Sequence, residues 1–278
     1  MSYYYLIAGL PDLEPGMDTR KIDFKGVVAT IQRNLAPRDE RQFRYLLYPN
    51  DNRNLLNTLW HKYKSFPNLE HVHFCTLKDE TLQDYHRQKS VFPPYIGEFL
   101  SIYEDQFPNM SPREMEDRLL DGFYEEAKKQ SPFIKEYFKF EKRLKEILAA
   151  YNASCYNFLS PPSAIDESIL GQVGKGKSVT PGFLREYPYI ETLGEKVDTK
   201  QPEELEKFID HIKWDYLQEV KDHFSGEQVF AYTLKLQLVL NERLSTLDRG
   251  APHFQELQKT IKSKIQSPII STTCQKVK

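Results

Sequence analysis

Residues 111–157 read SPREMEDRLLDGFYEEAKKQ followed by SPFIKEYFKFEKRLKEILAAYNASCYN, and this stretch decides the fold. Its first half carries a helix start signal. Ser111 can act as N-cap, Pro112 suits the first helical position, and Glu114 completes a capping box. A second Ser-Pro pair at Ser131 repeats the signal at the start of the second half. The stretch therefore predicts two consecutive helices.

The second of these helices has an apolar stripe near a period of 3.6 residues, which is typical of an amphipathic helix. The stripe consists of Ile134, Tyr137, Phe138, Leu144, Ile147, Leu148 and Tyr151. At about 1.5 Å per residue, a helix from Pro132 to Asn152 is roughly 30 Å long, enough to cross a small domain. No metal cluster or phosphate loop lies in the stretch, so we interpret it as scaffold.

Helical periodicity recurs in segments that begin or end at Pro, Gly or Ser. Besides the central pair, the expected helices span residues 18–35, 37–48, 51–63, 95–103, 202–224, 227–247 and 254–265. In this interpretation Asp18 caps the first of them, and Pro49 separates the second from the third. Residues 3–10 fit a short strand, a helix start or a buried plug, and residues 65–94 fit helix or loop.

No strand alternation recurs along the chain, so the predicted class is all-α with about ten helices. Residues 160–200 are rich in Pro and Gly, which is typical of a connector or of a set of short helices. We expect one helical domain over residues 1–266, with possible halves 1–159 and 201–266 joined by 160–200. The tail 267–278 lacks periodicity and is predicted to be mobile.

Composition excludes several classes of protein. The 38 basic and 40 acidic residues give a net charge of −2, which leaves no global footprint for nucleic acid. The three cysteines are too few for a disulfide framework and fit a reducing compartment. The apolar run at residues 3–10 is too short to span a bilayer and lacks the basic region of a signal peptide. We therefore expect a cytoplasmic protein. Its 17 Tyr residues suit half-exposed contact surfaces.

The sequence GQVGKGKS, from Gly171 to Ser178, matches the P-loop pattern letter for letter. In a P-loop, Lys177 reaches the β- and γ-phosphates and the final Ser holds Mg²⁺. That site also requires a buried strand before the loop and an uninterrupted helix after it. Two acidic residues, Asp166 and Glu167, precede this loop, and Pro181 follows it closely, so the context argues against a P-loop. A flexible, basic, Gly-rich loop is the favoured interpretation, and nucleotide binding stays as an alternative.

Two further sets invite a chemical interpretation. In an extended HVHFC segment, His71, His73 and Cys75 would point to one face with a spacing suited to Zn²⁺, but no fourth ligand is evident. The second set is a group of carboxylates that alternate with Arg and Lys on one helix face, which favours a solvated, charge-paired surface over acid–base chemistry. These carboxylates are Glu114, Glu116, Asp117, Asp121, Glu125 and Glu126. We therefore assign no catalytic, cofactor-binding or metal residue.

Three stretches carry a resemblance to a known family. They are YYYLIAGLPDL near the start, FYEEAKKQSPFIKEYFKFEKRLKEILAAYN from Phe123, and AYTLKLQLVLNERLSTLD from Ala231. Together they resemble a bacterial family of unknown function that is encoded with V/A-type rotary ATPase subunits. Members of that family are similar to the central-stalk component of these ATPases that is known as C, or as d in eukaryotes. The resemblance covers most of the chain and is least clear at residues 64–94 and 160–200.

The resemblance implies a non-enzymatic coupling part. The stalk component that the family resembles is an all-α funnel of three helical modules, and it seats the central shaft subunits on the membrane-embedded proteolipid ring. The implied partners are therefore those shaft subunits and the ring of a proton- or sodium-translocating ATPase, and the implied location is the cytoplasmic side of the inner membrane. This chain is shorter than the stalk component, which puts a full three-module funnel in doubt. A general helical interaction protein outside the ATPase is the other alternative.

Overall fold

The computed structural model describes residues 2–18, 22–67, 69, 72, 74–87, 91–156, 167–174, 179–199, 201–220 and 224–244. These residues form helices and no strand, which confirms the all-α prediction. The helices are α1 (Tyr4–Ala8), α2 (Phe24–Asn34), α3 (Pro37–Lys64), α4 (Asp79–Gln83), α5 (Pro94–Tyr103), the 3₁₀-helix η3 (Glu104–Gln106), α6 (Pro112–Ala127), α7 (Pro132–Tyr156), α8 (Glu167–Gln172), α9 (Pro181–Glu186), α10 (Ile190–Asp198), α11 (Pro202–Gln218) and α12 (Gly226–Leu244).

The central pair, α6 and α7, begins where the sequence predicts. The Oγ of Ser111 accepts a hydrogen bond from the N–H of Glu114 at 3.1 Å, as an N-cap does. The expectation that Ser131 repeats this cap is wrong. Its buried Oγ has no hydrogen-bond partner among the described residues, while its N–H donates to Oε1 of Gln42 at 3.0 Å. A side chain of α3, distant in sequence, therefore satisfies the Ser131 N–H.

Helix α3 runs unbroken through Pro49, so the predicted break there is wrong. An internal proline removes one helical hydrogen bond and costs about 3 kcal/mol. Buried leucines on both sides of Pro49, including Leu46 and Leu55, offset that cost. Asp51 and Asn54, one turn further on, bind the backbone of the segment that ends at Leu77. Tertiary packing therefore keeps the helix continuous.

Helix α2 begins later than expected. Its N-cap is Asp23, whose Oδ1 accepts a hydrogen bond from the N–H of Gly26 at 3.0 Å, so the prediction of Asp18 as the cap is wrong. Both acids suit the position, and a local signal alone does not choose between them. The segment at residues 3–10, for which strand and helix were both open, forms the short helix α1. Its position is fixed by Tyr3, which lies just before it and is buried.

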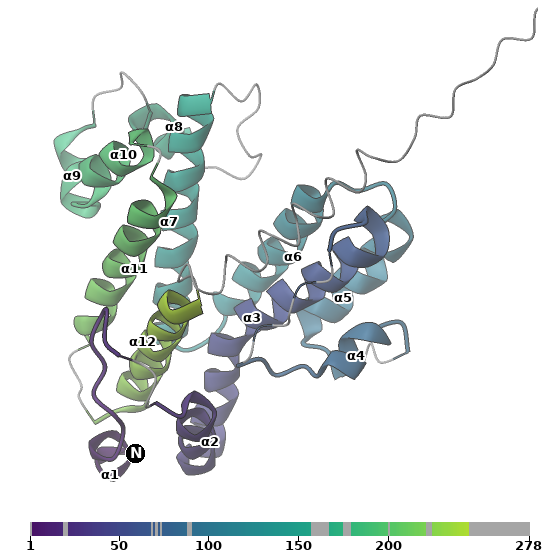
Figure 1. Cartoon of the computed structure of the whole chain (residues 1–278), viewed down its shortest axis with the longest axis vertical. Coiled ribbons are helices and arrows are strands. Elements are labelled where there is room, and N and C mark those ends of the chain that lie inside the picture. Colours follow the sequence, from purple (N-terminus) through teal and green to yellow (C-terminus); the bar gives the residue numbers. More distant parts are fainter. Residues whose placement is uncertain are drawn as a thin grey trace, which may run out of the picture.

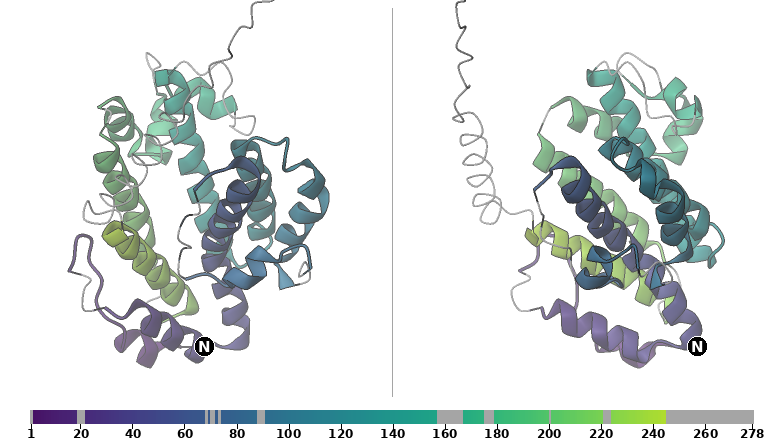
Figure 2. Two further views of the ribbon diagram at one scale, coloured as in Figure 1. Left: turned by 45° about the vertical axis from the view of Figure 1, so that its right-hand side comes forward. Right: turned by 90° about the vertical axis from the view of Figure 1, so that its right-hand side faces the viewer.

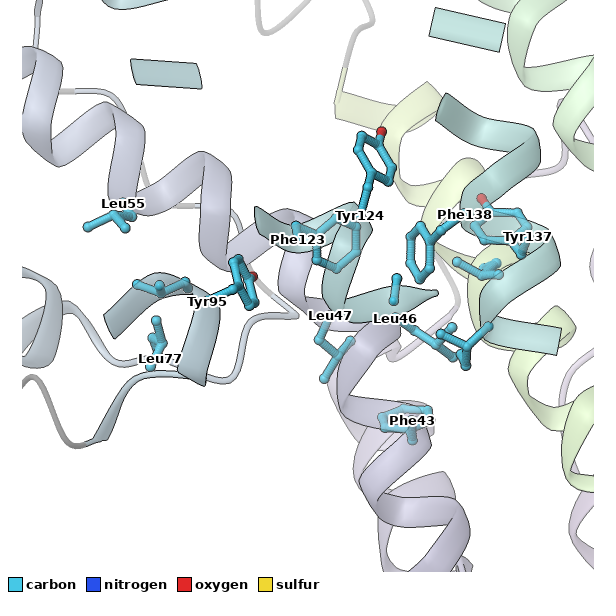
Figure 3. Close-up of a cluster of buried hydrophobic side chains, with 14 of the residues drawn as sticks. Phe43, Leu46, Leu47, Leu55, Leu77, Tyr95, Phe123, Tyr124, Tyr137 and Phe138 are labelled. Atoms are coloured by element: carbon cyan, nitrogen blue, oxygen red, sulfur yellow. The ribbon is translucent and has the colours of Figure 1, made fainter. Parts of the chain in front are cut away.

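The larger of two hydrophobic cores, the first core, lies between α2, α3, α5, α6, α12 and the first part of α7. Aromatic rings dominate its centre (Figure 3), where Phe123 of α6 meets Phe138 of α7 edge to face at 4.8 Å. Tyr95 of α5 reaches the same group, with its ring 5.6 Å from that of Phe123. The first part of the predicted apolar stripe of α7 is thus buried in this core, against helices that come before and after it in the chain.

The second core is smaller and lies at the other end of α7. It consists of Leu144, Ile147, Ala150, Ile169, Val173, Ile190, Leu193 and Ile212. Residues 169–193 supply four of these, so the segment expected to form a connector or short helices forms short helices that pack. In Figures 1 and 2, α8, α9 and α10 gather around the far end of α7, away from α1 and α2. Close packing there leaves no room for a side chain at Gly194, where an added Cβ would lie 2.7 Å from the hydroxyl of Tyr151.

Two helices contribute to both cores. Helix α7 places Phe138 in the first core and Leu144 in the second, and α11 places Trp214 in the first and Ile212 in the second. Between them, the ring of Phe140 stacks on a tyrosine ring of α11, Tyr216, at 4.1 Å and 8°. The division into halves 1–159 and 201–266 stays a prediction. The expected helix at 254–265 and the tail 267–278 lie outside the described residues.

Candidate functional site

The P-loop candidate lies partly on α8. Gly171, its first residue, is in that helix, and the residues directly before it, from Glu167, are helical as well. A P-loop has a β-strand at this place. After the loop, Thr180 is the N-cap of the six-residue helix α9, which begins at Pro181. Lys177 and Ser178, which would contact phosphate and Mg²⁺, lie outside the described residues.

The HVHFC candidate is only partly described, because His71 and His73 lie outside the described residues. Cys75 is a half-buried free thiol whose Sγ donates to the carbonyl of Leu77 at 3.2 Å. Burial raises its pKa, and the neighbouring carboxylates Asp51 and Asp79 add to that effect. Over the described part of the chain, no group of three or more His, Cys, Asp or Glu side chains could hold a metal ion.

Most carboxylates of α6 face solvent, as expected, whereas Glu126 turns toward α3 and accepts a hydrogen bond from the hydroxyl of Tyr45 at 3.1 Å. Each of them is exposed or half-buried. Asp117 is 3.9 Å from Arg113, four residues earlier, and Glu126 is 3.8 Å from Lys129, three residues later. Glu125 forms a close ion pair with Lys128. This is the predicted pattern of helix charge pairs, and such exposed pairs contribute little to stability.

The structure brings together a group of several ionisable side chains that the sequence did not predict. Nε2 of His86 lies 2.6 Å from Nζ of Lys62, and its Nδ1 contacts a carboxylate oxygen of Glu104. Beside it, the hydroxyls of Tyr63 and Tyr85 are 2.8 Å apart, and burial together with this hydrogen bond raises the pKa of Tyr85. The group joins the end of α3, the segment after α4, and η3. Its side chains already satisfy one another, so we interpret it as a structural link.

Two cavities open on the surface beside the N-terminal segment. The larger, about 440 Å³, lies between residues 15–16, α10, α11 and α12. The two lysines that line it form ion pairs. Lys196 lies 3.4 Å from Glu204, and Lys207 lies 2.9 Å from Glu203. The smaller, about 190 Å³, lies between the end of α1 and the first turns of α12. The paired lysines of the larger cavity differ from the convergent free polar groups of a small-molecule site.

The end of the molecule at α1 is built on Tyr3. Its hydroxyl donates to Oδ2 of Asp39 at 2.5 Å and accepts from the N–H of Ala36 at 3.0 Å, which fixes α1 to the start of α3. Its N–H donates to the carbonyl of Phe224 at 2.8 Å, which fixes the turn before α12. Burial and the Asp39 hydrogen bond raise the pKa of Tyr3, so the hydroxyl stays protonated. One buried residue thus joins three distant segments.

Beyond this anchor, aromatic side chains point to solvent. Tyr5 is 90% exposed, Tyr4 52% and Phe224 46%. The ring of Tyr4 lies 5.5 Å from that of Tyr5 and 5.1 Å from that of Phe224. We call these three residues the aromatic end. Grouped exposed aromatic rings mark contact sites for other molecules more often than single ones do.

A family model matches residues 1–265 and is described as "Protein of unknown function (DUF2764)". The chain belongs to this family. The family description names neither an activity nor a partner. No curated protein and no solved structure matches the chain.

The sequence pattern missed the buried acid of this DUF2764 protein, Glu141 on α7. Its carboxylate lies 3.7 Å from Lys213 of α11 and 4.0 Å from Lys145. Burial acts to raise the pKa of Glu141, but the two lysines hold it below its usual value. Glu141 falls three residues after Phe138 and three before Leu144, within the apolar stripe. An acidic residue within an apolar helix stripe is the one sequence feature that could have indicated a buried ion pair here.

No helix in the described part of this DUF2764 protein has the length and apolar content needed to cross a lipid bilayer. Many charged residues form pairs on helix faces, as on α6 and at the start of α11. Among the described features, the aromatic end is the surface best suited to a macromolecular partner, while the cluster around His86 and the pair Glu141–Lys213 have structural partners.

Proposed function

We propose that this protein is a non-catalytic coupling subunit of a V/A-type, proton- or sodium-translocating ATPase, placed between the central shaft subunits and the proteolipid ring. The proposal starts from the resemblance of residues 123–152 and 231–248 to a family encoded with such ATPases. Both stretches are structural in the folded chain. They supply most of α7 and α12, which contribute Phe138 and Val239 to the first core.

The observation that best supports the proposal is that the same two helices run through both cores. A coupling part transmits force, so its two ends must move together. Helix α7 is 25 residues long and enters both cores without a break. Helix α11 enters both as well, and the pair is joined by the stacked rings of Phe140 and Tyr216 and by the buried ion pair of Glu141 with Lys213. Such a body suits the transfer of position and torque.

Affinity purification from native membranes tests the role. A tagged copy of the chain should recover shaft and ring subunits of the ATPase after mild detergent extraction. Deleting the gene should leave ATP hydrolysis by the remaining head while ATP-driven ion transport in vesicles falls, because hydrolysis no longer turns the ring. Recovery of partners without any ATPase component would support a general helical interaction protein instead.

A variant at the joint makes the test sharper. Phe140→Ala removes the stacked ring between the cores, and truncation of a buried aromatic costs about 3–5 kcal/mol, less for a half-buried one. Reduced transport per ATP hydrolysed, with normal recovery of the subunits, is the expected result. Phe66→Ala is the matched control, because Phe66 is 44% exposed and lies in neither core.

Calorimetry with Mg-ATP addresses the nucleotide-binding alternative. In the proposed function, the wild-type protein and Lys177→Ala give no binding heat. Heat that is present in the wild-type protein and lost in Lys177→Ala would favour a phosphate site at residues 171–178 and would argue against a purely mechanical role.

A further inference from the structure

The aromatic end lies next to the N-terminal turn of α3. Tyr3 is hydrogen-bonded to Ala36 and Asp39 at that turn, and Tyr4 and Tyr5 follow directly in the chain. Arg38 and Arg41 lie three residues apart on the exposed side of the first turns of α3. Figure 1 shows α1, α2 and the start of α3 together at one end of the molecule. Aromatic and arginine side chains are therefore presented at the same end.

Of the three exposed rings, that of Tyr5 is covered least. Tyr5 is almost fully exposed although it lies on a helix that packs against the protein. Its neighbours Leu6 and Ile7 are partly buried against the first core, so α1 is held by one face and presents the other. Tyr, Phe and Arg are the residue types enriched at the centres of protein interfaces. Covering the aromatic end by a partner would remove its apolar surface from water.

The α2 and α3 side of the aromatic end is positive, although the whole chain has a net charge of −2 and an exposed acid, Glu227, lies on the α12 side. Residues 22–48 contain five Lys and Arg residues against three acids. All three acids have partners: Asp23 caps α2, Asp39 accepts from Tyr3, and Glu40 lies 3.0 Å from Arg44. Arg38 and Arg41 form no ion pair with any described residue. The α3 side of the aromatic end, where Arg38 and Arg41 lie, therefore complements an acidic partner.

We propose that the aromatic end, together with Arg38 and Arg41, binds an acidic segment of another protein subunit. Apolar side chains of that segment cover Tyr4, Tyr5 and Phe224, and its carboxylates pair with the two arginines. Arginine can hold a carboxylate through two parallel hydrogen bonds, which gives geometric specificity as well as attraction. The inference rests on the proposed function, because a coupling subunit needs a docking surface at an end of its rigid body.

Site-specific photocrosslinking in cells tests the surface. Tyr5 is replaced by a benzophenone-bearing phenylalanine in a tagged chain, and the crosslinked peptide is identified after purification. The control places the same amino acid at Lys139, whose side chain is 73% exposed on α7. We expect position 5 to crosslink to an acidic segment of another subunit, and the control position not to reach that segment.

Charge reversal completes the test. Arg38→Glu/Arg41→Glu should lower the crosslink yield at position 5 by about tenfold, because two favourable ion pairs become repulsive. This variant should fold, since Glu is favourable near a helix N-terminus, and unchanged circular dichroism checks that it does. The matched variant Arg113→Glu, on the outer face of α6, should leave the yield unchanged.

The outcomes separate the two proposals. If ATPase subunits are recovered while position 5 crosslinks to nothing, to a second copy of this chain, to lipid or to a basic segment, the surface inference is wrong and the coupling role stands. If position 5 crosslinks to an acidic segment of a protein outside the ATPase, the coupling role is wrong and the surface inference stands. An unchanged yield in Arg38→Glu/Arg41→Glu would also overturn the inference.

Discussion

Asp51 is the residue whose titration the structure predicts most directly. Its carboxylate is completely buried on α3, two residues after Pro49. Oδ1 accepts the N–H groups of Thr76 at 2.8 Å and Leu77 at 2.9 Å, and Oδ2 accepts the hydroxyl of Thr76 at 2.7 Å. Burial raises the pKa of Asp51 to about 6, although the three hydrogen bonds act to lower it.

This raised pKa makes stability depend on pH with a defined sign. An aspartate in the unfolded chain has a pKa of about 3.9. Between that value and about 6 the folded state holds a proton that the unfolded state has released, so the free energy of unfolding falls as the pH rises. A shift of about two pKa units corresponds to about 3 kcal/mol. The stabilisation is therefore fully present below about pH 4 and lost by about pH 7.

Asp51→Asn isolates this contribution. The Oδ1 atom of asparagine can still accept the two N–H groups, and its amide can donate to the Thr76 hydroxyl, so the packing is kept while the charge is removed. Urea unfolding followed by circular dichroism at several pH values from about 4 to 7 measures both proteins. We expect the stability of the wild type relative to Asp51→Asn to fall by about 3 kcal/mol across that range. Groups common to both proteins cancel in the difference.

Asp51→Ala is the control for the hydrogen bonds. It leaves two buried N–H groups without partners, each at a cost of about 1–3 kcal/mol, at every pH. A difference between the wild type and Asp51→Asn that stays flat across the pH range would falsify the raised pKa. A difference that increases with pH would show that the hydrogen bonds outweigh burial and that the carboxylate is ionised throughout this range.

Three further predictions concern packing and buried hydrogen bonds. Gly194→Ala should lose about 1–3 kcal/mol of stability in urea unfolding, because its Cβ meets a tyrosine ring of α7; Gly182→Ala, with open space around it, should show no loss, and equal losses would contradict the close contact. Tyr3→Phe should cost about 1–3 kcal/mol through two lost hydrogen bonds, whereas Tyr5→Phe should leave the urea midpoint unchanged. Leu144→Pro should leave no soluble helical protein, since it breaks α7 at a buried residue; a soluble variant with native circular dichroism would refute the strut interpretation.

Local signals predicted the helix starts well where a proline supplied them. Helices α3, α6, α7 and α11 begin at Pro37, Pro112, Pro132 and Pro202, the positions expected for a fixed φ angle and a missing N–H. The same reasoning failed at Pro49, because the cost of an internal proline is local while the packing that offsets it comes from other helices. A rule based on backbone conformation holds only where the free energy gained from tertiary contacts is smaller than the free-energy cost of the local conformation.

Buried polar partners were the features that the sequence pattern could not pair. Asp51 binds a segment 25 residues away, and Glu141 approaches Lys213, which belongs to a different helix far along the chain. Glu141 was visible as an acid within an apolar stripe, but its partner was not, because several helices carry lysines at comparable positions. Similarly, Tyr3 belonged to an apolar run with three possible conformations, and only its bonds to Ala36 and Asp39 define its role.

The periodicity of α7 predicts which of its residues are buried but not which helices pack against them. Its stripe from Ile134 to Tyr151 predicts one buried face, but one continuous face can meet different neighbours along its length. In the folded chain the neighbours change near Phe140, from the rings of α6 and α12 to the aliphatic side chains of α8 and α10. The change follows from the short helices after residue 166, whose Pro- and Gly-rich sequence fits either a connector or a packed layer. The segment after residue 166 therefore determines that α7 joins two cores, and the sequence pattern of α7 itself does not predict this.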